Sequence, residues 1–256
     1  MKQFYSIFIL AKLNAREWIR LKFFHIIIFF GLLFIAFSHM LSSLTFSVQE
    51  RLLYDFGLAG LELGVIVISS LIGTHSIQRE IDRKTLFVLL ARPLPRSYIV
   101  LGSWLSILIL CFLFSSGFLF SLIISADHSN YNLGLLLASF SSLLKAMVIS
   151  SFAIAFGLLV RPILALGATI SYWILCYSLP DIQFFVLKLK DEALISAFQV
   201  LEKLLPQFYR YNWKSFYYIT HIPSSSEILW SIFHSLAWTF VWLFLASLFF
   251  RRKEIV

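Results

Sequence analysis

The chain has 256 residues, of which 60% are hydrophobic and only 13% charged, and its formal net charge is +8. Soluble domains carry about 25% charged residues, so this composition excludes an ordinary water-soluble fold. The mean hydropathy of +0.87 instead indicates an integral membrane protein. Because no apolar run shows the alternation of a membrane β-barrel, we predict an all-α protein with a single transmembrane domain over residues 1–256.

An amphipathic helix is predicted at residues 5–22, ahead of the first apolar run. At 100° per residue, apolar side chains gather on one side of this helix and basic ones line the next. These are Phe8, Ala11, Ala15, Trp18 and Ile19, and then Lys12, Arg16 and Arg20. Such a helix would lie in the membrane interface with its basic residues facing anionic head groups. The alternative is that it is the solvated start of the first span.

Six apolar windows are each long enough to cross a bilayer as a helix, and we predict six transmembrane spans. They cover about residues 23–46, 56–78, 98–126, 133–160, 163–180 and 228–250. The second span contains Gly60-x-x-x-Gly64 and Ser69-x-x-x-Gly73, and small residues at this spacing let helices approach closely. This span should therefore pack inside the bundle.

Both cysteines, Cys111 and Cys176, fall inside predicted spans. A disulfide framework is therefore not supported, and we expect both to be packing residues.

Lysine and arginine are unevenly distributed among the connections. Of the 21 basic residues, 14 lie in the N-terminal arm, in the connection 79–97, at Arg161 and after the sixth span. Because such residues mark the cytoplasmic side, both termini are predicted to be cytoplasmic. The net positive charge then reflects topology and does not indicate nucleic-acid binding.

The longest connection, residues 181–227, is expected on the outer side. Residues 191–205 have apolar side chains at helical spacing, acidic residues at the start where a helix dipole favours them, and Pro206 after the end. The run PQFYRYNWKSFYY that follows is rich in the aromatic residues typical of a membrane interface. We predict a lid-like, surface-lying helix with an aromatic belt.

Two ionisable residues lie inside predicted spans, Glu62 in the second and Lys145 in the fourth. A charge within a bilayer costs a few kcal/mol at least and usually faces a cavity or a partner. Both helices enter from the outer side, so a Glu62–Lys145 pair is possible and would mark a candidate substrate pathway. The alternative is that each side chain snorkels to the outer surface.

Motifs for catalysis, nucleotide binding or metal binding are not found. None of the ten glycines precedes a lysine, so the sequence G-x-x-x-x-G-K-[ST] of a P-loop is absent. The six histidines are scattered without metal-ligand spacing. We therefore predict that the chain is not an enzyme and holds no cofactor or metal of its own.

The connection 79–97 has features that a simple tether does not need. Charged residues of both signs precede the apolar run LFVLL at 86–90, which would face the cytoplasm. An exposed apolar run of this kind requires a partner or the membrane surface. We predict a docking segment here. The alternative is that its charges only enforce topology.

The pattern RE-x-x-x-x-TL-x-x-LL-x-RP-x-x-RSY-x-x-x-G at 79–102 resembles a loop of type-2 ATP-binding-cassette (ABC) exporter permeases, the one between their second and third spans. The matching positions are Glu80, Thr85, Leu89, Leu90, Pro93, Arg96, Tyr98 and Gly102. Lys84 and Ser103 depart from the family, whose members often have Gly and Lys there. The run LLPQFYRYN is similar to an outer segment of some of these permeases.

The resemblance implies that a separate ABC ATPase (nucleotide-binding) subunit binds ATP and Mg, while this chain couples hydrolysis to export of a substrate. The connection would be a coupling helix. Its ionic docking residues would be Glu80, Asp82, Arg83 and Lys84, and its apolar ones Leu86, Phe87 and Leu90.

The same resemblance implies an N-terminal elbow helix at 5–22, a second copy of this or a related permease, and the bacterial cytoplasmic (inner) membrane. Two alternatives remain. One is a non-transport assembly or mechanotransmission subunit, and the other a secondary transporter, which would be expected to show inverted repeats not seen here. No motif identifies the cargo.

Overall fold

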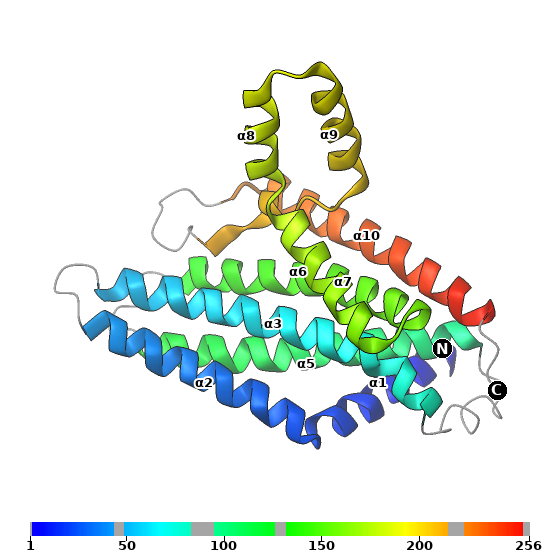
Figure 1. Cartoon of the computed structure of the whole chain (residues 1–256). Coiled ribbons are helices and arrows are strands. Elements are labelled where there is room, and N and C mark those ends of the chain that lie inside the picture. The colour runs from blue at the N-terminus through cyan, green and yellow to red at the C-terminus, as the bar shows by residue number, and fades with distance from the viewer. Residues whose placement is uncertain (1, 44–48, 83–94, 126–131, 215–222, 253–256) are drawn as a thin grey trace.

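The computed structural model describes residues 2–43, 49–82, 95–125, 132–214 and 223–252 (Figure 1). Within these ranges every regular element is a helix, as the composition predicts. In chain order they are α1 (Lys2–Ile19), α2 (Lys22–Ser43), α3 (Gln49–Asp82), α5 (Arg96–Ser125), α6 (Asn132–Leu159), α7 (Pro162–Tyr177), α8 (Leu179–Leu189), α9 (Glu192–Leu204), the 3-10 turn η2 (Phe208–Tyr211) and α10 (Ser225–Arg252).

Four of the described helices are long and apolar enough to cross a membrane, namely α3, α5, α6 and α10. The helices α7 and α8 meet at a bend of 59° and would make a fifth span if taken together. The first predicted span falls on α2, whose described apolar stretch, Ile28–Phe37, is shorter than a span requires. The predicted count of six is therefore not confirmed.

The helices α3 and α6 share the most extensive contact in the described bundle. Small residues permit it: a Cβ atom added at Gly73 would lie 2.5 Å from the Cβ of Ala153, and one at Gly157 would lie 2.6 Å from the carbonyl oxygen of Thr74. Gly73 belongs to the second small-residue pair in the sequence, and Ser69 of that pair is also buried. The prediction that this span packs inside the bundle is confirmed.

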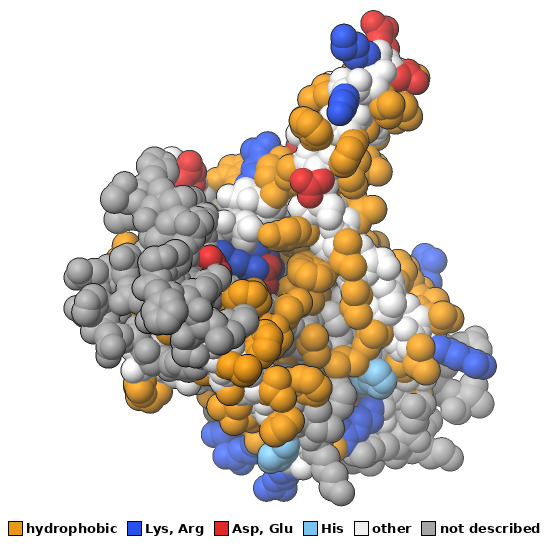
Figure 2. All heavy atoms as spheres, turned by 60° about the vertical axis from the view of Figure 1, so that its left-hand side comes forward, with side chains coloured by type: hydrophobic (Ala, Val, Ile, Leu, Met, Phe, Trp, Pro, Cys, Tyr) orange, Lys and Arg blue, Asp and Glu red, His pale blue; other side chains and the backbone are white. Residues whose placement is uncertain are grey.

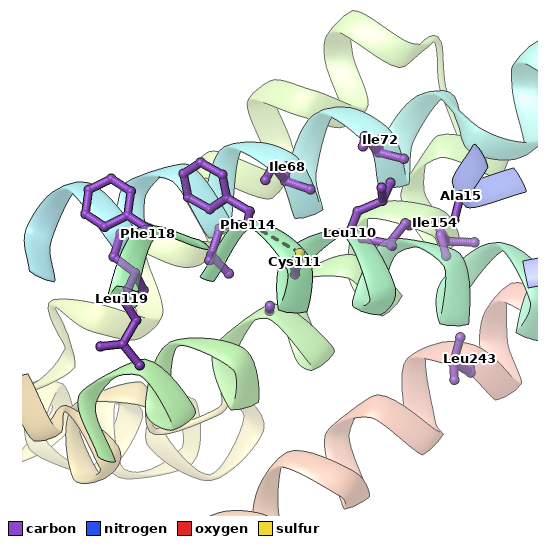
Figure 3. Packing of buried hydrophobic residues seen from close by; sticks show 14 of the residues in the cluster. Ala15, Ile68, Ile72, Leu110, Cys111, Phe114, Phe118, Leu119, Ile154 and Leu243 are labelled. Atoms are coloured by element: carbon purple, nitrogen blue, oxygen red, sulfur yellow. Dashed lines mark hydrogen bonds between the residues drawn. The ribbon is translucent and has the colours of Figure 1, made fainter. Parts of the chain in front are cut away.

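A hydrophobic core joins α3, α5 and α6, with contributions from α1 and α10 (Figure 3). Phe114 of α5 lies beside Ile68 of α3 in this core, and Phe118 follows it one turn along α5. Apolar burial against protein gains little over burial against lipid, so such packing acts mainly through van der Waals contact. Both cysteines are free and buried, as expected for packing residues.

The N-terminal helix α1 packs across the start of α5. A Cβ atom added at Gly102 would lie 3.0 Å from the Cβ of Leu10, so this glycine allows the close approach. Ala11 and Ala15 are buried, whereas Phe8 is exposed, so only part of the predicted apolar side faces protein. The location of this helix in a membrane interface stays a prediction.

Segments rich in basic residues gather at the end of the bundle where both termini lie (Figure 1). Arg79 Nη2 donates to Glu17 Oε1 over 2.9 Å, which ties α3 to α1. Arg96 Nη1 donates to the carbonyl oxygens of Phe250 and Arg251 at 3.0 and 3.3 Å, which ties α5 to α10. For the described residues, the grouping inferred from charge is therefore a grouping in space, while its cytoplasmic location stays a prediction.

The helices α8 and α9 form a hairpin that projects from the bundle (Figure 1). The predicted helix at 191–205 is present as α9, and the Asp191 side chain caps it by accepting from the backbone N–H of Ala193 at 2.9 Å. Charged side chains gather at the hairpin tip and apolar ones along its sides (Figure 2). The hairpin stands away from the bundle, so it is not the lid lying along the surface that the sequence suggested.

We predict opposite effects for two glycine-to-alanine substitutions in helices. Gly157→Ala forces a Cβ atom against the backbone of α3, and overpacking of this kind costs about 1–3 kcal/mol. Gly167→Ala meets no atom within 4 Å, and alanine favours helix by about 1 kcal/mol. Thermal unfolding in one detergent should therefore give a lower midpoint for the first variant and an unchanged or higher one for the second. Equal midpoints would contradict the close α3–α6 contact.

Candidate functional site

Glu62 of α3 and Lys145 of α6 form a buried ion pair. Lys145 Nζ lies 2.9 Å from Glu62 Oε1, and the two side chains are 0% and 2% exposed respectively. Of the two alternatives left open by the sequence, the Glu62–Lys145 pair is present and snorkelling of both side chains is wrong. Their proposed role on a substrate pathway remains a prediction.

The outer segment completes this pair with two further polar side chains. Lys145 Nζ also donates to Asn212 Oδ1 at 3.2 Å, and the second carboxylate oxygen of Glu62, Oε2, is paired with Lys214 Nζ. Asn212 Nδ2 in turn donates to the hydroxyl of Tyr177 at 3.0 Å, and the Tyr177 ring centroid lies 5.7 Å from Lys145 Nζ. We call these five residues the charged cluster.

Aromatic side chains hold the outer segment in place. Phe208, Tyr211 and Trp213 are at most 2% exposed. Phe208 lies edge-on to Tyr172 of α7 with ring centroids 6.5 Å apart, and Trp213 stacks near Phe140 of α6 at 6.4 Å. The aromatic belt expected at a membrane interface is thus, in its described part, buried between helices.

A second layer of aromatic contacts ties α6, α7 and α10 together beneath this segment. The rings of Phe152 and Tyr172 are parallel within 2° at a centroid distance of 3.9 Å. Trp242 of α10 lies edge-on to Phe152 at 4.7 Å, and its Nε1 donates to the Tyr172 hydroxyl at 3.1 Å. This hydrogen bond compensates for the burial of the Trp242 N–H and the Tyr172 hydroxyl.

Polar contacts fix the start of η2. The backbone N–H of Gln207 donates to Nε2 of His234 in α10 at 3.2 Å. The hydroxyl of Tyr209 donates to Glu202 Oε1 in α9 at 2.9 Å. The segment that delivers Asn212 and Lys214 is therefore anchored to α10 and to the base of the projecting hairpin.

Charge is not balanced within the cluster, because one carboxylate faces two ammonium groups. Figure 2 shows basic and acidic side chains next to one another on a face whose described part is largely hydrophobic. The arrangement suits binding of a charged group. Among the described residues no group of three His, Cys, Asp or Glu side chains could hold a metal ion.

Two of the residues predicted to dock an ATPase, Glu80 and Asp82, lie at the opposite end of α3. Glu80 is half-buried in the last turn of that helix, where its Oε1 accepts from Asn14 Nδ2 of α1 at 3.3 Å. It is thus engaged within the chain. Asp82 ends the helix. The other predicted docking residues, namely Arg83, Lys84, Leu86, Phe87 and Leu90, lie outside the described residues.

Three members of the cluster, Tyr177, Asn212 and Lys214, escaped sequence reasoning. A usable signal exists in Tyr211-Asn212-Trp213-Lys214, where aromatic and polar residues alternate. Alternation places side chains on opposite sides of an extended segment, so it indicates one buried aromatic face and one polar face.

A family model described as "ABC-2 family transporter protein" matches residues 61–255. The matched region includes the whole charged cluster, the connection between α3 and α5, and α10. Comparison with curated proteins finds no match.

We predict that Glu62→Gln destabilises the chain more than Lys145→Met. Loss of the carboxylate leaves two neighbouring ammonium groups without a counter-charge, and breaking a buried pair in this way costs about 3–5 kcal/mol. Lys145→Met leaves the Glu62–Lys214 pair intact and removes the excess charge, so its cost is smaller. Thermal unfolding of the purified variants measures the order.

The double variant provides the control. Once Glu62 is Gln, replacing Lys145 by Met should cost less than it does alone, because the unpaired buried charge is then removed. Additive effects, or a larger loss for Lys145→Met than for Glu62→Gln, would contradict the shared-carboxylate arrangement.

Proposed function

We propose that this chain, which belongs to the ABC-2 family of transporter proteins, couples ATP hydrolysis by a separate subunit to export of a substrate across the membrane. The family match over residues 61–255 carries the proposal, and it confirms the resemblance drawn from residues 79–102. Membership makes the chain a multi-pass permease subunit and implies association with an ABC ATPase. Export and its coupling to ATP are the proposed steps.

In this proposal the chemistry is divided between subunits. The permease provides the membrane path, and the partner ATPase binds ATP and Mg and hydrolyses the nucleotide. The lack of a P-loop sequence in this chain supports that division.

The continuity of α3 provides a route for mechanical coupling. This helix runs without a break from Gln49 to Asp82, so one rigid element joins the connection 79–97 to Glu62. The 18 residues from Glu62 to Glu80 span about 27 Å at 1.5 Å per residue. A displacement imposed on the connection by the ATPase would therefore reach the charged cluster as a rigid-body movement.

The N-terminal helix would move together with α3. Asn14 and Glu17 of α1 contact Glu80 and Arg79 of α3 through a hydrogen bond and an ion pair. A salt bridge exposed on one side is worth little by itself, but here it adds to a helix already packed on α5. We infer that α1 acts as the elbow helix of the permease and stabilises the end of α3 that faces the ATPase.

The proposed site of action is the bacterial cytoplasmic membrane, with both termini in the cytoplasm and two permease copies in the complex. The gathering of basic segments at one end of the bundle supports this orientation. The projecting α8–α9 hairpin then lies on the outer side.

The proposal is tested by reversing charge at the connection. The tagged chain is purified from its native membranes, and the ATPase subunit that accompanies it is measured. The double variant Arg83→Glu with Lys84→Glu should lower this recovery at least about tenfold, because like charges at an interface cost several kcal/mol. The matched control is Lys188→Glu with Lys190→Glu at the hairpin tip, which makes the same change in net charge far from the connection.

The control should retain the ATPase at the wild-type ratio. Unchanged recovery in the connection variant, or equal loss in both variants, would contradict docking through residues 79–97. Quantitative mass spectrometry of the purified material measures the ratio of the two polypeptides.

A further inference from the structure

Every acceptor atom in the charged cluster already has a donor. Glu62 Oε1 accepts from Lys145, and Glu62 Oε2 is paired with Lys214. Asn212 Oδ1 accepts from Lys145, and the hydroxyl oxygen of Tyr177 accepts from Asn212 Nδ2. The two lysines have six N–H donors between them, of which these contacts use three, so spare donors remain in the cluster.

Two residues that solvent can reach, Lys214 and Tyr177, have unused donors. An ammonium group carries three N–H donors, and that of Lys214 contacts only Glu62 among the described residues. The Tyr177 hydroxyl keeps its own proton to donate. The Lys214 side chain is 26% exposed and Tyr177 is 37% exposed, whereas Glu62 and Lys145 are buried.

The net charge of the cluster is positive, which favours an anionic ligand just as the spare donors do. Two lysines face one carboxylate, and the described residues place no second carboxylate within ion-pair distance of either lysine. Because both lysines share the single carboxylate of Glu62, a ligand that supplies one negative charge beside Lys214 would balance the charge of the cluster. A cation would be repelled, and a neutral group would leave the charge unbalanced.

We propose that the charged cluster is a binding site for an oxyanion, a phosphate or carboxylate group. Lys214 and Tyr177 donate to it directly, and the buried Lys145 adds electrostatic attraction from below. Charge-assisted hydrogen bonds from lysine to such groups are among the stronger polar contacts. Trp213 and its aromatic neighbours hold Lys214 in position, so the site is built before the ligand arrives.

The oxyanion has two possible carriers that share this chemistry. It is either a group on a soluble molecule or the phosphate of a lipid head group in the outer leaflet. Assigning it to the exported cargo rests on the proposed function, whereas oxyanion binding itself does not.

The test uses the full-length chain purified in a neutral detergent, with thermal unfolding followed as a function of ligand concentration. One arm compares inorganic phosphate with chloride at equal ionic strength. The other compares dihexanoyl phosphatidic acid with dihexanoyl phosphatidylcholine. Because a ligand that binds only the folded state raises its stability, saturable stabilisation by phosphate identifies a soluble anion, and stabilisation by phosphatidic acid alone identifies a lipid head group.

Matched variants assign the effect to the cluster. Lys214→Gln should weaken binding at least about tenfold, the loss expected for one charge-assisted contact, and Lys214→Arg should retain binding. Lys203→Gln, an exposed lysine of α9, is the control and should bind as the wild type does. Tyr177→Phe removes the hydroxyl donor with little change of shape, and it should weaken binding even if Lys214→Gln fails to fold.

Two results would overturn the proposal. One is the absence of saturable stabilisation by either anionic probe, and the other is equal binding by Lys214→Gln and Lys203→Gln. Neither result bears on ATPase association, which the charge-reversal experiment measures separately.

Discussion

The close approach of α3 and α6 is the constraint on which the site depends. Gly73 meets Ala153, the backbone of Thr74 meets Gly157, and Glu62 meets Lys145, so the two helices run in the same direction with a nearly constant offset along the sequence. Within a bilayer, apolar side chains gain little from choosing protein over lipid, so packing of small residues and polar contacts decide which helices associate. The ion pair fixes the register that the small residues allow.

The outer segment links the contact between α3 and α6 to α7 and α10. Buried aromatic residues of 208–213 hold it between α6, α7 and α10, while Asn212 and Lys214 engage the ion pair. Any shift of α3 relative to α6 must therefore change the contacts of the outer segment. In the proposed mechanism, a movement that begins at the Asp82 end of α3 would reach the charged cluster at Glu62 without breaking α3.

Prediction from sequence succeeded where the signal is local. Apolar length located the helices, helical spacing and Pro206 located α9, and the rarity of charges in spans singled out Glu62 and Lys145. Prediction failed for contacts between residues that are distant in the chain. Lys214 lies 152 positions from Glu62, and a hydropathy pattern carries no information about their contact. The bend after Tyr177 does have a local marker, because Pro180 stands in the first turn of α8. The docking residues 83–90 fall outside the described ranges and stay predictions.

The most direct measurement for the whole account is ATP turnover by material purified through a tag on this chain from its native membranes. The account predicts hydrolysis that accompanies the chain at a constant ratio through successive purification steps, together with a second polypeptide that binds ATP. A pure preparation of this chain that contains no second polypeptide and hydrolyses no ATP would contradict it.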